Sequence, residues 1–307
     1  MKETFGQKTR RSHKRNQRVV MFWCAFVFAF VIAGVWLFRG TLFQNDSGAS
    51  SSGTNQSRHD ACGTADSRQK STDVTQAPMD HEVCQKLQDL VSQDQRVQQV
   101  IDNCEIYPED ILKMLSRNLD MLNFVLEYPE KVGQVVAETV GEVEGGEVPL
   151  LLQYDQRWGY GDYGNSSVAV SGCGPACLSM VITSLTGDDT ITPYVVAQYA
   201  SEQGYYVPGA GTAWTLMSEG AKHFGVIGEE LPLTKSIMEG VLKEGRPIIC
   251  SMRPGDFTTT GHFIVITGIK DGQFTVNDPN STERSNMLWD YDTLKPQISN
   301  LWAFQAL

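Results

Sequence analysis

The sequence predicts an α+β domain at the C-terminal end of the chain, preceded by a helical region, a flexible stalk and a membrane anchor. Three observations lead to this prediction. Residues 19–38 are twenty uncharged, mostly apolar residues, enough to span a hydrocarbon core of about 30 Å. Residues 81–147 repeat apolar side chains at helical spacing, whereas residues 148–307 alternate helical and strand-like segments.

The apolar segment is interpreted as an uncleaved anchor rather than a secretory signal. A signal has an apolar part of about 7–15 residues and a small-residue cleavage site, but this segment is longer and ends in Gly-Val-Trp-Leu-Phe-Arg. Basic residues gather in residues 1–18, a cytosolic tail, and only Arg39 follows the segment closely. The positive-inside rule therefore predicts a single span with the later residues outside the cell membrane, and a bacterial surface suits this composition best.

Charge and composition divide the chain in the same way. The chain carries a net charge of −11, and residues 1–40 hold eight Lys or Arg against one Glu, which leaves −18 for residues 41–307. Such an acidic part is repelled by phosphate backbones, so no nucleic-acid partner is expected. Residues 39–80 are polar, with few large apolar side chains, and this composition is typical of a flexible stalk.

Residues 81–147 predict a small helical bundle. Apolar residues fall on one face of its first segment, and Pro108, followed by two acidic residues, marks the start of another helix. We interpret this region as a structural spacer packed against the following domain. Cys84 and Cys104 bracket one segment of it, and outside the membrane they could form a disulfide.

The C-terminal domain, residues 148–307, is expected to contain helices and strands in alternation. The expected strands are 148–153, 247–252, 262–267 and 273–277, and helices are expected after Cys173, at 193–201 and after Trp214.

Cys173 is the strongest candidate for a reactive group. It lies in Ser-Gly-Cys-Gly-Pro-Ala-Cys at 171–177, where Pro175 suits the first position of a helix that runs to Gly187. A thiol at a helix start meets unpaired backbone N–H groups and the positive end of the helix dipole, which favour the nucleophilic thiolate. Cys177, one turn further along, is the rival nucleophile.

The remaining cysteines do not indicate a metal site. No Cys-x-x-Cys pair occurs, and the Gly-Pro between Cys173 and Cys177 argues for a shaped turn rather than zinc ligation. Cys250 falls in the middle of a strand and is expected in the core. We therefore expect no metal and no other cofactor.

A nucleophilic thiol needs a base and a group that orients the base. His262 opens an apolar strand, and Asp278 follows the next one. A three-residue loop at 270–272 would place Ile264 opposite Asp278, with His262 on the same face. A two-residue loop would put His262 and Asp278 on opposite faces unless a bulge intervenes, because side chains alternate along a strand. Gln153 is the candidate oxyanion donor, together with backbone N–H at the helix start.

Five segments of the C-terminal domain together resemble a known family. They are Gln153-x-Asp-x-Arg-Trp-Gly159, Ser171-Gly-Cys-Gly-Pro-x-Cys-Leu-Ser-Met180, Gly211-Thr-x-Trp214, Gly261-His-Phe-x-Val-x-Thr-Gly268 and Asn277-Asp-Pro279. In this order they are similar to the peptidase C39-like group of papain-like cysteine peptidases. The resemblance implies a papain-like fold with Cys173 as nucleophile, His262 as base, Asp278 as orienting acid and Gln153 as oxyanion donor.

We therefore expect a membrane-anchored, extracytoplasmic cysteine peptidase that hydrolyses peptide or isopeptide bonds in a peptide or protein substrate. Two alternatives stay open, a peptidoglycan amidase and a non-catalytic surface module that keeps the fold. The best-known members of the group are cytosolic domains of export transporters that clip double-glycine leader peptides. No transporter domain is evident here and the site is expected outside, so leader processing is not expected.

Overall fold

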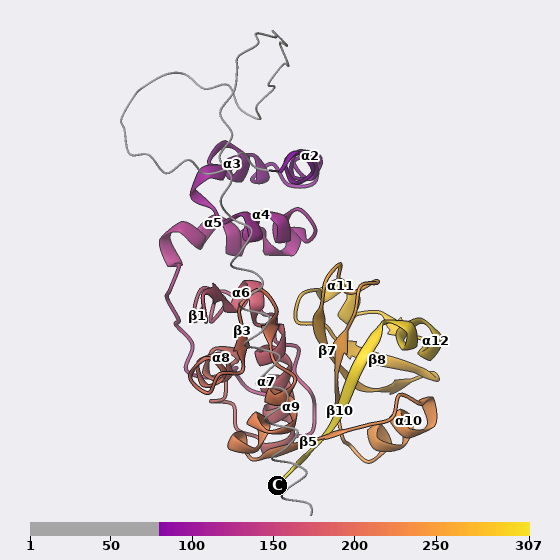
Figure 1. The fold of residues 1–307 in the computed structure, drawn as a ribbon. Coiled ribbons are helices and arrows are strands. Elements are labelled where there is room, and N and C mark those ends of the chain that lie inside the picture. The colour runs from indigo at the N-terminus through magenta and orange to yellow at the C-terminus, as the bar shows by residue number, and fades with distance from the viewer. Residues whose placement is uncertain (1–79) are drawn as a thin grey trace, which may run out of the picture. The chain divides into compact units, whose positions relative to one another are not determined.

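The computed structural model describes residues 80–307 (Figure 1). The expected anchor at 19–38 and all but the last residue of the expected stalk lie outside the described residues. Within residues 80–307, no helix is long and apolar enough to cross a membrane. The domain boundaries stay predictions.

The helical region contains short helices and 3₁₀ turns that share a core with the domain after them. In order they are α2 (His81–Leu90), α3 (Val97–Asp102), η1 (Cys104–Ile106), α4 (Glu109–Leu115), η2 (Leu119–Met121) and α5 (Leu122–Lys131). Their apolar side chains form one cluster with Tyr154, Tyr160 and Ala169. Phe124 stacks on Tyr160 with ring centroids 4.3 Å apart, and the Tyr160 hydroxyl donates to the Phe124 carbonyl at 3.1 Å. The helical region is therefore packed into the domain. The pairing of Cys84 with Cys104 stays a prediction.

The C-terminal domain combines helices with a six-stranded sheet. Its helices and 3₁₀ turns are α6 (Val168–Ser171), α7 (Cys173–Thr186), α8 (Pro193–Glu202), α9 (Thr215–Ser218), η3 (Gly220–Phe224), α10 (Lys235–Lys243), α11 (Thr282–Ser285), α12 (Tyr291–Leu294) and η4 (Lys295–Gln297). Its strands are β1 (Asp162–Tyr163), β2 (Ser166–Ser167), β3 (Tyr206–Val207), β4 (Gly211–Thr212), β5 (Val226–Glu230), β6 (Ile248–Met252), β7 (His262–Lys270), β8 (Gln273–Asn277), β9 (Leu288–Trp289) and β10 (Ile298–Ala306).

The large sheet separates two cores. Its strand order is β5-β10-β6-β7-β8-β9, and every neighbouring pair is antiparallel. Phe263 and Val265 of β7 pack into one core with α7. This helix lies between α8 and the sheet (Figure 1). Ile264 and Ile266 point to the opposite face and join a second core. This alternation is what strands with two buried faces require.

Residues 148–153 do not form the strand expected from the sequence. Pro149 has no N–H to give to a ladder, and the neighbouring residues bond to the segment around Asp278 instead. The Gln153 N–H donates to the Pro279 carbonyl at 2.8 Å, and the Val148 carbonyl accepts from the Asn277 side chain at 2.9 Å. The segment therefore runs beside the end of β8 without joining the sheet.

The connection between β7 and β8 is a two-residue turn, so the expected three-residue loop at 270–272 is wrong. Lys270 pairs with Gln273. Asp271 and Gly272, with φ of 54° and 79°, both occupy the left-handed region, as a type I′ hairpin turn requires. Such a turn by itself would place His262 and Asp278 on opposite faces of the sheet.

A bulge in β7 restores the side-chain alternation that the site needs. Ile266 pairs with Val276, but Gly268 pairs with Thr275, so Thr267 is an extra residue on β7. The Thr267 and Thr275 hydroxyls are hydrogen-bonded at 2.9 Å. Beyond the bulge Val265 pairs with Asn277, which places Ile264 opposite Asp278, the register expected from the sequence.

Deleting Thr267 should leave the pairing beyond the bulge unchanged, because the hairpin becomes regular without moving Ile264 from Asp278. We expect a modest loss of stability, on the order of 1 kcal/mol, and an intact contact between His262 and Asp278. Inserting one Ala between Phe263 and Ile264 should instead turn His262 to the opposite face. NMR of the His262 ring nitrogens checks both variants, and loss of the contact in the deletion variant would contradict this register.

Candidate active site

Cys173 is the first residue of α7, and Gly172 is its N-terminal cap. Pro175 therefore occupies the third helical position and not the first, because α7 begins two residues earlier than the sequence suggests. Its missing N–H is still one of those that a helix start leaves unpaired. The helix ends at Gly187 in the left-handed conformation, φ 73°, as predicted.

The first turn of α7 is packed closely against β4. A Cβ added at Gly174 would lie 2.7 Å from the Thr212 hydroxyl oxygen, so this position has no room for a side chain. That hydroxyl is also hydrogen-bonded to the Tyr163 hydroxyl at 2.8 Å. The glycine after Cys173 and the Gly211-Thr212 pair therefore act together to fix the helix start that carries the thiol.

His262 and Asp278 meet where β7 begins and β8 has just ended. The His262 Nε2 and Asp278 Oδ1 atoms are 2.7 Å apart, and the Asp278 side chain is wholly buried. Oδ1 also accepts from the Asn280 N–H at 2.8 Å, and Oδ2 accepts from the Arg284 Nε at 2.5 Å. Three donors thus surround one carboxylate. Because Nε2 of His262 bonds to Asp278, Nδ1 is the ring nitrogen that is not bonded to it.

The electrostatics of this cluster favour a protonated His262. Burial by itself lowers the pKa of His262, but the charge and hydrogen bond of Asp278, with a smaller contribution from Cys173, raise that pKa to about 10. Burial would raise the pKa of the Asp278 carboxyl, yet His262 and Arg284 hold that pKa below its usual value. The arrangement is therefore an imidazolium held between a buried carboxylate and a thiol.

Cys173, His262 and Gln153 line one cavity of about 570 Å³. Gln153 is buried, and its Nε2 donates to the Ala169 carbonyl at 2.5 Å. Its Oε1 is buried and has no hydrogen-bond partner among residues 80–307. A side-chain amide carries two N–H donors, so one of them remains for a ligand in the cavity.

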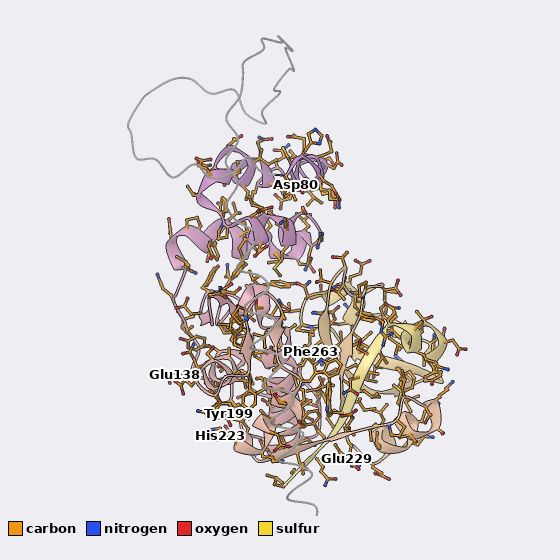
Figure 2. The ribbon with its side chains drawn as sticks, in the orientation of Figure 1. Asp80, Glu138, Tyr199, His223, Glu229 and Phe263 are labelled. Carbon is orange, nitrogen blue, oxygen red and sulfur yellow. The ribbon has the colours of Figure 1, made fainter. Side chains whose placement is uncertain are left out.

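Cys177, Cys250 and His223 do not line this cavity. Cys177 and Cys250 are wholly buried in the core, and burial raises the pKa of both thiols well above the usual value, which disfavours reaction at either. His223 stacks on Tyr199 with ring centroids 4.2 Å apart. Figure 2 shows this pair well apart from Phe263, the residue after His262.

Arg284 is a member of the cluster that the sequence does not reveal. It lies in α11, it pairs with Asp278, and it also lines the cavity. The Ser285 hydroxyl accepts from the Asp278 N–H at 2.9 Å and adds a further tie between α11 and this segment. An Arg six residues after an Asp belongs to no motif, so only the fold could identify it.

The fold and the site together define a mixed α/β domain with a thiol and an imidazole at one cavity and a buried carboxylate bonded to the imidazole. Residues 146–305 match the model of the Peptidase_C39 like family. Because this match covers more than half of the chain, the chain belongs to that family. No curated protein matches the chain.

Two solved structures of low sequence identity also align with the chain. One is the peptidase domain of Streptococcus ComA, described as a bi-functional ABC transporter involved in a quorum sensing pathway, with 16% identity, a TM-score of 0.36, and coverage of 45% of this chain and 93% of that one. The other is described as a C39-like peptidase from Bacillus anthracis, with 12% identity, a TM-score of 0.31, and coverage of 52% and 94%.

Replacing Asp278 with Asn should lower the pKa of His262, because burial then acts without the opposing charge. A histidine whose folded-state pKa is raised contributes stability that is complete below its unfolded pKa of about 6.5 and is lost as the pH rises to the folded value. We therefore expect the difference in free energy of unfolding between wild type and Asp278→Asn to shrink between pH 6.5 and about 10. Denaturant unfolding at a series of pH values measures it, and a constant difference would contradict the pairing.

Proposed function

We propose that this chain is a membrane-anchored, extracytoplasmic cysteine peptidase that hydrolyses peptide or isopeptide bonds through Cys173, His262, Asp278 and Gln153. The observation that carries the proposal is the 2.7 Å contact of His262 with the buried Asp278, because His262 lines the same cavity as Cys173 and Gln153. Membership of a C39-like peptidase family supports the same chemistry.

The reaction begins with attack of the Cys173 thiolate on the carbonyl carbon of the substrate. The carbonyl oxygen becomes an oxyanion, which accepts hydrogen bonds from Gln153 Nε2 and from backbone N–H at the start of α7. His262 then gives its proton to the nitrogen of the leaving amine as the C–N bond breaks, and a thioester remains on Cys173.

Water completes the cycle. His262, now neutral, accepts a proton from a water molecule, and the resulting hydroxide attacks the thioester carbonyl. The C–S bond breaks, the acid product leaves, and the thiolate and imidazolium pair is restored. Asp278 stays ionised throughout and holds the ring of His262 in one orientation, in the way that a carboxylate orients the base of other catalytic triads.

The extracytoplasmic placement of the proposed site rests on the sequence. The apolar segment at 19–38, with its basic N-terminal flank, favours an anchor whose following residues lie outside. The acidic residues after it suit a peptide or protein substrate better than a polyanion.

Alkylation of the full-length chain, purified in mild detergent, tests the nucleophile. We expect iodoacetamide to label Cys173 at pH 6 at least about tenfold faster in wild type than in His262→Ala, because the imidazolium stabilises the thiolate. Mass spectrometry of the digest reads out each cysteine, and the buried Cys177 of the same helix is the internal control. Equal labelling of Cys173 in both proteins would contradict the proposal.

Hydrolysis distinguishes the substrate classes with the same proteins. Incubated with short synthetic peptides, wild type should release new amino termini, Cys173→Ala should fall to background, and His262→Ala should lose about a hundredfold or more. Peptidoglycan fragments form the second arm. Hydrolysis of those fragments alone would identify an amidase, and no hydrolysis of either substrate would indicate a non-catalytic surface module.

A further inference from the structure

The helical region forms one wall of the cavity that holds Cys173 and His262. On that side its lining includes the apolar Leu90, Met114 and Leu119 and the polar Gln93, Asn118 and Asp120. The family match begins at residue 146, so this wall lies outside the part of the chain that the family shares. We propose that the helical region is a substrate-binding element, in which Leu90, Met114 and Leu119 receive an apolar side chain of the peptide that Cys173 attacks. The inference rests on the proposed function.

Hydrogen bonds tie the wall to the segment that carries the buried carboxylate. Asn118 Nδ2 donates to the Asn280 carbonyl at 2.8 Å, and the Thr282 hydroxyl donates to the Asp120 carboxylate. Both partners lie between Asp278 and Arg284 in the sequence. The wall is therefore held in a fixed position relative to the cluster, as a surface that positions a substrate must be.

The chemistry of the two sides fits a peptide with an apolar side chain. Leu90, Met114 and Leu119 are partly buried, pack against the core of the helical region and also line the cavity. The loop at residues 255–261 brings three consecutive threonines to the same cavity. Leu90, Met114 and Leu119 give a leucine-like side chain a surface to bury, and the threonine hydroxyl groups of the same cavity can bond to a peptide backbone.

The volume of the cavity is consistent with binding of a peptide. A volume of about 570 Å³ lies within the range of about 300–1,000 Å³ seen for specific ligand sites. Met114 has an unbranched and adaptable side chain, so the wall can fit apolar groups of different shape. A few residues of a peptide on either side of the cleaved bond would fill the space.

The test uses the full-length chain with Leu119→Ser and Met114→Ser, and Ile106→Ser as the matched control. Ile106 lies in the same helical region and is 51% exposed, but it does not line the cavity. The probes are short synthetic peptides with blocked ends, in which one position at a time is Leu or Gly. We expect wild type and the control to prefer Leu at one position by roughly tenfold in kcat/KM. The two wall variants should lose this preference, mainly through a higher KM.

A second variant does not depend on the core of the helical region. Gln93 is exposed and lines the cavity, so Gln93→Trp should fold normally and narrow the cavity. We expect it to raise KM for the peptides and to leave the labelling of Cys173 by the small reagent iodoacetamide unchanged.

The outcomes separate the two proposals. If wild type cleaves peptides and Leu119→Ser, Met114→Ser and Gln93→Trp cleave them with unchanged preference and KM, the wall does not bind substrate, while the proposed function stands. If wild type cleaves no peptide although Cys173 is labelled as a thiolate, the proposed function fails, and this inference fails with it.

Discussion

The buried carboxylate of Asp278 is the constraint on which the site depends. A charge without exposed surface is costly unless partners surround it, and here the partners come from His262 in β7, Arg284 in α11 and the Asn280 N–H. The backbone carbonyl of the residue after Asp278 accepts a hydrogen bond from the Gln153 N–H. Pairing one carboxylate therefore brings a strand end, a helix and the candidate oxyanion donor into one corner of the domain.

Strand alternation made the relation of His262 to Asp278 predictable from the sequence, although not in detail. β8 begins and ends at the expected residues, and Ile264 lies opposite Asp278. The turn is one residue shorter than expected, and the bulge at Thr267 adds one residue back. These two features have equal and opposite effects on the register. The bulge depends on a cross-strand neighbour, Thr275, and no local pattern indicates such a contact.

The features that sequence reasoning missed are those that depend on distant parts of the chain. Arg284 matters because α11 folds back onto Asp278. Residues 148–153 look like a strand, but they bond to the last side chain of β8 and to the backbone after it instead of joining the sheet. β10 pairs with both β5 and β6, which precede it by many residues. Periodicity reports which face of a segment is buried, and it carries no information on what buries that face.

The proposed chemistry requires solvent exposure to increase from Asp278 through His262 to Cys173, and the fold meets this requirement. Asp278 has no exposed surface, His262 is 8% exposed, and Cys173 is partly exposed at the cavity. A dry carboxylate holds its partner strongly because water does not screen it, whereas a thiol that attacks a substrate must be reachable. Asn118 and Asp120 of the helical region hydrogen-bond to residues that closely follow Asp278 in the sequence, so this region helps to hold that segment in place. The helical region is therefore tied to the site by hydrogen bonds and also lines its cavity.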